Sequence, residues 1–108
     1  MAKLLLHEDP DVRKELARAL AKLGPSVLVK LKALYAKGLD EGGEGYRLRL
    51  AIQAAYLEFA RVHAPDALRP VMDQVLRGLE DGHWLVRSMA AQVVEMLARR
   101  EAEGDARA

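Results

Sequence analysis

The chain has 108 residues, which is enough for one domain with a single hydrophobic core and too few for two. Hydrophobic residues make up 51% of the sequence and charged residues 31%, a balance that excludes a globally disordered chain. The net charge is only +1, and the absence of Cys excludes disulfides, thiolate-bound metals and cysteine nucleophiles.

The composition favours helices over strands. Ala, Leu, Arg, Glu and Lys dominate, whereas Thr and Asn are absent and Ile occurs once, so we expect an all-α domain. No apolar run reaches the length of a membrane span, and the three leucines at 4–6 are too few for a signal peptide, which predicts a cytoplasmic protein. The scarcity of amide side chains and the abundance of Arg and Glu favour a thermophilic source.

Two helices are expected in the first third of the chain. Residues 9–11 (Asp-Pro-Asp) combine a capping carboxylate, a proline suited to the first helical position and an acid that complements the helix dipole. Gly24 and the following proline end that helix. A second helix is expected over 25–37, closed by Gly38.

Three more helices are expected in the rest of the chain. The segment 46–63 is apolar over most of its circumference, which predicts the central helix of the domain. The chain restarts at 64–66, and Pro70 marks either the true start of the next helix or a kink in it. The last helix is expected over 83–100, and residues 101–108 are expected to fray.

An apolar residue followed by arginine recurs at intervals of 36 and 38 residues, as Val12-Arg13, Leu48-Arg49 and Val86-Arg87. Apolar positions then align in three sets, namely Leu16 with Ile52 and Ala90, Leu20 with Tyr56 and Val94, and Leu23 with Phe59 and Leu97. A period of this length is typical of stacked helical pairs. On these residues the chain resembles the HEAT-repeat family, a group of armadillo-type α-solenoids.

The resemblance implies a short right-handed α–α superhelix of about two and a half helical hairpins, with five main helices, formed by residues 1–100 as a single domain. It also implies a surface for macromolecular partners and does not imply a reaction. An ordinary five-helix bundle is the alternative fold.

The repeated arginines Arg13, Arg49 and Arg87 have two possible interpretations. They could form a ladder that binds an anion or a phosphate backbone. Alternatively, each arginine pairs with a carboxylate of the turn before it and fixes that turn; the partners would then be Asp9, Glu44 and Asp81, respectively.

A basic patch is a further candidate site. Residues 1–39 carry eight Lys or Arg against four acids, and the candidate patch consists of Arg18, Lys22, Lys30, Lys32 and Lys37. Such lysines usually form a solvated helix face. The alternative is a weak contact with nucleic acid.

The last expected helix is apolar over more than half of its circumference, yet no later helix follows to cover it. We therefore expect a second copy or another protein to dock there, on an interface formed by Trp84, Leu85, Met89, Val93 and Met96. Trp84 is interpreted either as a staple packed on the preceding helix, against Leu79, or as an exposed anchor for a partner.

No catalytic constellation, cofactor motif or metal site is found. The two serines, Ser26 and Ser88, lie outside any nucleophile motif, and no histidine stands at a ligand-like spacing from His83 and Asp81. The sequence therefore predicts a non-enzymatic protein-interaction module that forms a homodimer through its last helix. The alternative function is a small nucleic-acid-associated factor.

Overall fold

The computed structural model describes residues 2–40 and 44–107 of the chain. This part forms six α-helices and contains no strand, so the prediction of an all-α fold is confirmed. In chain order the elements are α1 (Ala2–Leu5), α2 (Pro10–Leu23), α3 (Val27–Asp40), α4 (Gly45–Val62), the 3-10 helix η2 (Pro65–Val71), α5 (Met72–Gly78) and α6 (Trp84–Arg107).

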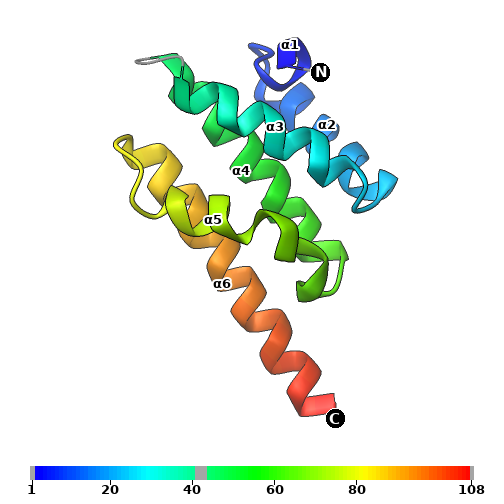
Figure 1. Cartoon of the computed structure of the whole chain (residues 1–108). Coiled ribbons are helices and arrows are strands. Elements are labelled where there is room, and N and C mark those ends of the chain that lie inside the picture. The colour runs from blue at the N-terminus through cyan, green and yellow to red at the C-terminus, as the bar shows by residue number, and fades with distance from the viewer. Residues whose placement is uncertain (1, 41–43, 108) are drawn as a thin grey trace.

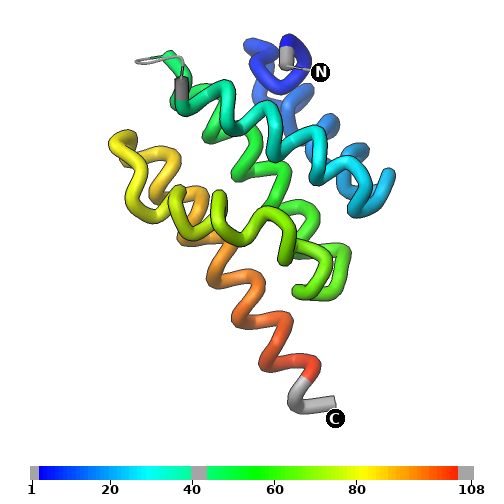
Figure 2. The backbone as a smooth tube through the Cα atoms, viewed as in Figure 1, coloured from blue at the N-terminus to red at the C-terminus, as the bar shows by residue number. Residues whose placement is uncertain are grey.

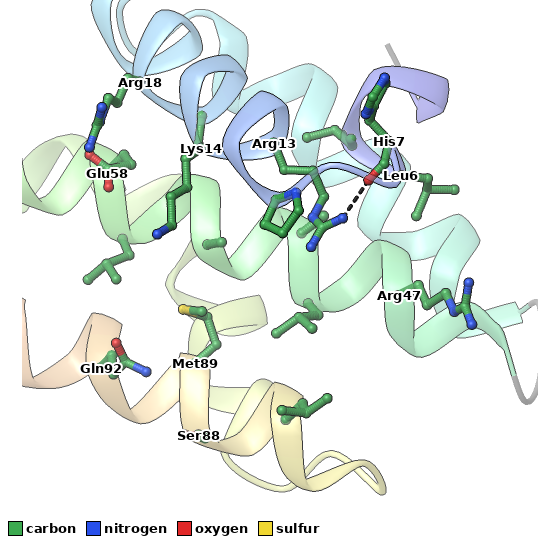
Figure 3. Close-up of a pocket in the computed structure, with 18 of the residues that line it drawn as sticks. Leu6, His7, Arg13, Lys14, Arg18, Arg47, Glu58, Ser88, Met89 and Gln92 are labelled. Atoms are coloured by element: carbon green, nitrogen blue, oxygen red, sulfur yellow. Dashed lines mark hydrogen bonds between the residues drawn. The ribbon is translucent and has the colours of Figure 1, made fainter.

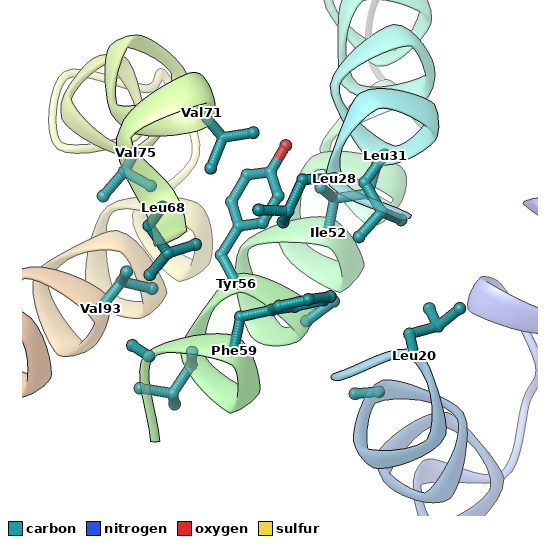
Figure 4. Packing of buried hydrophobic residues seen from close by; sticks show 14 of the residues in the cluster. Leu20, Leu28, Leu31, Ile52, Tyr56, Phe59, Leu68, Val71, Val75 and Val93 are labelled. Atoms are coloured by element: carbon teal, nitrogen blue, oxygen red, sulfur yellow. The ribbon is translucent and has the colours of Figure 1, made fainter. Parts of the chain in front are cut away.

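The helices form two layers. In Figure 1, α3 and α5 lie in front, and α2, α4 and α6 lie side by side behind them. The central helix is α4, which packs against α2, α3 and α6, as its wide apolar surface predicted. Its side chains Ile52, Tyr56 and Phe59 are fully buried and join leucines and valines from the neighbouring helices, as Figure 4 shows.

The start and end of α2 follow from local chemistry. The Asp9 carboxylate accepts the backbone N–H of Asp11 at 2.9 Å, and Pro10 occupies the first helical position. Gly24 ends the helix with φ at 99°, a conformation that L side chains rarely adopt. Leu23 was aligned with core positions, but it is 69% exposed because it is the last residue before this turn.

The second helix does not end at Gly38, and that prediction is wrong. Helix α3 continues to Asp40, and Gly38 is buried where α3 crosses the start of α4. A Cβ at Gly38 would lie 3.1 Å from Cγ of Arg49 and 3.3 Å from the carbonyl oxygen of Gly45. The glycine therefore permits a close helix crossing rather than stopping a helix. The expected loose segment falls partly on residues 41–43, which lie outside the described residues.

Pro70 lies inside the 3-10 helix η2, and regular α-helix begins at Met72, two residues after the proline. The structure therefore comes closer to the expected helix start at Pro70 than to a kink within an α-helix. The short helix α5 that follows lies close to α4 and α6 at Gly78.

A buried polar network joins the two layers. Gln53 Nε2 donates to Tyr35 Oη at 3.1 Å and to the Gln74 carbonyl at 2.9 Å, and Tyr56 Oη donates to Gln74 Oε1 at 2.6 Å. Gln74 Nε2 in turn donates to the Lys32 carbonyl at 2.9 Å. Burial raises the pKa of both tyrosines, so they stay neutral and connect α3, α4 and α5 through hydrogen bonds.

The last helix is longer than expected. We expected it to end near Arg100, but α6 continues to Arg107 and projects beyond the other helices in Figure 2. Arg100 donates to the carbonyls of Arg61 and His63 at 3.0 and 3.3 Å, which fixes α6 against the end of α4. The helix formers at 101–103 then extend α6 without a stop signal.

Candidate partner-binding groove

The repeated arginine of α4 lies in a nearly buried ion pair. Arg49 Nε and Nη2 donate to the two carboxylate oxygens of Asp81 at 2.6 and 3.1 Å, and Nη1 donates to the Gly38 carbonyl at 2.7 Å. The Arg49 and Asp81 side chains are 12% and 5% exposed. Arg49 therefore joins the end of α3 to the turn before α6 and is closed to an external anion.

The carboxylate of Asp81 is held in its charged form. Burial alone would raise the pKa of Asp81, but the hydrogen bonds from Arg49 and from the His83 backbone, together with the charge of Arg49, outweigh burial and lower the pKa. The His83 N–H donates to Asp81 Oδ1 at 2.9 Å.

Residues 7–13 and 81–87 share one hydrogen-bond pattern. In 7–13 the His7 ring accepts the backbone N–H of Asp9 at 3.0 Å, and the Asp9 carboxylate accepts the N–H of Asp11 at 2.9 Å. In 81–87 the Asp81 carboxylate accepts the backbone N–H of His83 at 2.9 Å, and the His83 ring accepts the N–H of Leu85 at 3.2 Å. In both segments the seventh residue, Arg13 or Arg87, donates to the backbone carbonyl of the first. Two of the three members of the sequence repeat, those at Arg13 and Arg87, therefore share one turn structure, whereas Arg49 binds Asp81 and the Gly38 carbonyl.

The carboxylate partners predicted for the arginines are wrong. Arg13 binds carbonyls rather than Asp9, and Arg87 binds the carbonyl of Asp81 rather than its carboxylate. Arg49 takes the carboxylate of Asp81, while Glu44 pairs with Arg47 at 3.0 Å. Arg13 and Arg87 do bind their own turns, which agrees with the turn-fixing interpretation.

A groove of about 840 Å³ runs along the face of α4 that points away from α3 and α5. Figure 3 looks onto it, with α2 above, α4 in the middle and α6 below. Its floor is apolar and comes from α4, through Leu50, Ala51, Ala54 and Leu57. A smaller hollow of about 140 Å³ continues it between α4 and α6 and is lined by Leu57, Arg61, Gln92, Glu95, Met96 and Arg99.

Positive charge surrounds the floor unevenly. Five cationic side chains line the groove against two carboxylates, Glu8 and Glu58; the cations are Arg13, Lys14, Arg18, Arg47 and Arg61. Three of them stand on α2 and two on α4, whereas the lining residues from α6 are uncharged: Leu85, Ser88, Met89 and Gln92. The α2 wall is therefore cationic and the α6 wall is not.

Most of these cations already have a partner. Arg18 pairs with Glu15 at 2.9 Å and Arg61 with Glu58 at 3.5 Å. None of the ion pairs among the described side chains involves Lys14, whose side chain extends from α2 over the groove in Figure 3. Lys14 is thus the cation best placed to meet a carboxylate of a partner.

The structure divides the interface expected on the last helix. Leu85 and Met89 line the groove, and Met96 lines the smaller hollow. Val93 is fully buried in the core, so its assignment to an open face is wrong. The reason is helical periodicity: Val86, Ala90, Val93 and Leu97 form the buried stripe of α6, and Leu85 and Met89 lie beside it.

Trp84 is 63% exposed, so it is not a staple buried on the preceding helix, and that interpretation is wrong. Its neighbour His83 stacks face to face on Tyr46, with ring centroids 3.8 Å apart, and so packs the start of α6 against α4 rather than against the preceding helix. Trp84 does not line the groove itself but stands one helical turn before Ser88, which does.

The predicted basic patch is not a single surface. Arg18 lies on the cationic wall of the groove. Lys32 is on α3 and reaches η2 and α5, where it donates to the Pro70 carbonyl at 2.9 Å and lies 3.7 Å from the Asp73 carboxylate. Lys30 and Lys37 are exposed on α3, and Lys22 is exposed near the end of α2. None of these four lysines lines the groove.

Most groove residues on α2 and α4 were not predicted from the sequence as site residues; these include Lys14, Arg47, Leu50 and Arg61. The available signal for the floor was the wide apolar surface of α4, which its neighbours leave only partly covered at Leu50, Ala51 and Ala54.

Among the described residues, no group of three or more His, Asp or Glu side chains is arranged to hold a metal ion. The same part of the chain contains no helix with the length and apolar character needed to cross a membrane. Comparison of the chain with models of known protein families, with curated proteins and with solved structures gave no match.

Proposed function

We propose that the protein is a non-enzymatic, HEAT-like interaction module that binds a partner protein in the groove formed by α2, α4 and α6. The observation that carries the proposal is the groove itself, which has a volume of about 840 Å³ and an apolar floor beside a cationic wall. An apolar concave surface of this kind is typical of a binding site rather than of a merely solvated face.

Two features support the HEAT-like part of the proposal. The turns 7–13 and 81–87 repeat one hydrogen-bond pattern, each leading into a helix of the same layer. The ion pair between Arg49 and Asp81 then joins one repeating unit to the next, as expected of a stack in which each unit contacts its neighbours.

A protein partner fits the groove better than a nucleic acid does. Phosphate backbones are bound by several clustered, uncompensated cations, but among the five lining cations only Lys14 has neither an acid nor a carbonyl partner among the described residues. The leucine and alanine floor also offers nothing to a phosphate, whereas it can bury the apolar side chains of a protein.

The partner of the proposed module can be a second copy, as expected from the last helix. Leu85 and Met89 would then contribute to a dimer interface, together with the exposed Trp84. Sedimentation equilibrium tests this form of the proposal, because a homodimer doubles the mass and a Leu50→Glu variant returns it to that of a monomer.

Leu50→Glu also tests groove binding in general, because it places a charge on the floor without touching the fully buried core. The matched control is Val29→Glu, which changes an exposed apolar residue of α3 outside the groove. We expect wild type and Val29→Glu to capture the same partner from a native extract and Leu50→Glu to lose it, with all three equally helical by circular dichroism. Equal capture by Leu50→Glu contradicts the proposal.

A further inference from the structure

The shape of the groove selects a helix as its occupant. The α4 residues that line the groove run from Tyr46 to Arg61 at three- and four-residue spacing, so the floor is about 22 Å long at 1.5 Å per residue. Helices α2 and α6 form walls on both sides, and Ala51 and Ala54 keep the middle of the floor low. A trough between two helices over a floor of small and aliphatic side chains accepts the apolar stripe of another helix.

The charge of the groove lining determines which charge the side chains of that helix should carry. Five cations and two carboxylates line the groove, and all of the cations stand on α2 or on α4. Arg18 and Arg47 pair with Glu15 and Glu44, which stand on or next to the same helices outside the lining, so the excess positive charge comes mainly from the α2 side at Lys14. Carboxylates of a docked helix would find Lys14 without an ion-pair partner among the described side chains. Arg18 stands on the next turn of α2, and its pair with Glu15 is solvent-exposed, with side chains 55% and 72% exposed, so that pair holds Arg18 only weakly. On the α6 side the same helix would meet the neutral residues Ser88, Met89 and Gln92.

Resting on the proposed function, we infer that the occupant is an acidic amphipathic α-helix of about four turns from a partner protein. Its apolar stripe lies on Leu50, Ala54 and Leu57 of α4 and against Met89 of α6, and its carboxylates project from one flank toward α2. The opposite flank is uncharged.

This asymmetry also fixes the direction of the bound helix. Turning the helix end for end while its apolar stripe stays on the floor exchanges the two flanks between α2 and α6. A helix with acids on only one flank therefore meets the cationic wall in one direction and the neutral wall in the other. Only the first direction pairs its carboxylates with Lys14 and Arg18.

The test uses three fluorescein-labelled designed peptides of about 16 residues, the number that spans the floor at 1.5 Å per residue. One carries a leucine stripe with glutamates on one flank, the second has lysine at each glutamate, and the third has glutamine at each leucine. Fluorescence anisotropy against the full chain should show saturable binding of the glutamate peptide. The lysine and glutamine peptides should bind at least tenfold more weakly.

Protein variants locate the site. Lys14→Glu/Arg18→Glu should weaken binding of the glutamate peptide about tenfold and strengthen that of the lysine peptide, because it reverses the charge of the α2 wall. The matched control, Lys30→Glu/Lys37→Glu, makes the same change of charge on exposed residues of α3 and should leave both affinities unchanged. All four substituted residues lie outside the buried core, so the variants should fold.

The outcomes separate the inference from the proposed function. Equal binding of the glutamate and lysine peptides, or binding of neither, overturns the inference. If the inference is overturned but Leu50→Glu still abolishes capture of a partner, the proposed function stands without the inference. If Leu50→Glu captures the partner as well as wild type does, the proposed function and the inference both fail. Binding of a labelled oligonucleotide that is lost in Lys14→Glu/Arg18→Glu, or groove-dependent dimerisation without peptide binding, would also overturn the inference by assigning another occupant.

Discussion

Replacing Arg49 by methionine should destabilise the protein strongly. The change leaves the Asp81 carboxylate, 5% exposed, without its bidentate partner and removes the bond to the Gly38 carbonyl. Breaking a buried ion pair on one side costs about 3–5 kcal/mol. We expect the lower end of that range, about 3 kcal/mol, because the N–H of His83 still donates to the carboxylate.

Urea unfolding followed by circular dichroism measures this loss as a fall in the free energy of unfolding. The matched control is Arg69→Met, which breaks an arginine–aspartate pair whose side chains are 81% and 87% exposed. The control should change stability by less than about 0.5 kcal/mol. Adding Asp81→Asn to Arg49→Met should recover about 1–2 kcal/mol, because it removes the unpaired charge and retains an acceptor for His83.

A loss of stability in Arg49→Met no greater than that in Arg69→Met would contradict a stabilising role of the buried ion pair. That role is also contradicted if Asp81→Asn adds its full single-variant cost to the double variant, because the two side chains would then be energetically independent.

Three further predictions concern pH, packing and fluorescence. The folded pKa of Asp81 lies below its unfolded value of about 3.9, so the contribution of Asp81 to stability is present above that pH and is lost as pH falls through the folded pKa. Wild type should therefore lose more stability than Asp81→Asn between pH 5 and pH 2 in urea titrations. Equal losses in the two proteins would contradict this prediction. Gly78→Ala should cost about 1–3 kcal/mol, because its Cβ would lie 2.8 Å from Cβ of Ala90, whereas Gly82→Ala, with open space around it, should be near neutral in the same assay. Trp84 is the single tryptophan, so intrinsic emission should be that of an exposed indole in the free protein and should shift to shorter wavelength when a partner fills the groove; no shift on saturation would exclude Trp84 as an anchor.

Local chemistry explains what the sequence could predict. The bounds of α2 follow from a capping carboxylate at Asp9 and from Gly24, and both act on neighbouring backbone groups. The central place of α4 follows from an apolar surface too wide for one neighbour. The equivalence of the turns at 7–13 and 81–87 was visible as an arginine repeat because each arginine binds within its own turn.

Tertiary contacts account for what the sequence could not predict. Gly38 has the signature of a helix stop, but α3 continues through it because the crossing with α4 needs the missing side chain. The partner of Arg49 lies 32 residues away, and no local rule selects Asp81 over Glu44. The sequence placed one residue of the cationic wall, Arg18, in a basic patch together with Lys32. The two lie on different surfaces, because α2 packs beside α4 and carries Arg18 to the groove, whereas Lys32 on α3 binds the Pro70 carbonyl.

The claim that the groove is the binding surface is tested most directly by the methyl resonances of the methionines in a ¹³C-methyl-labelled protein. Met89 lines the groove and Met96 the hollow that continues it, whereas Met72 lies on α5 in the other layer. On titration with the one-flank acidic peptide, the Met89 resonance should shift most, Met96 less, and Met72 should stay in place. A shift at Met72 with Met89 unchanged would contradict the account.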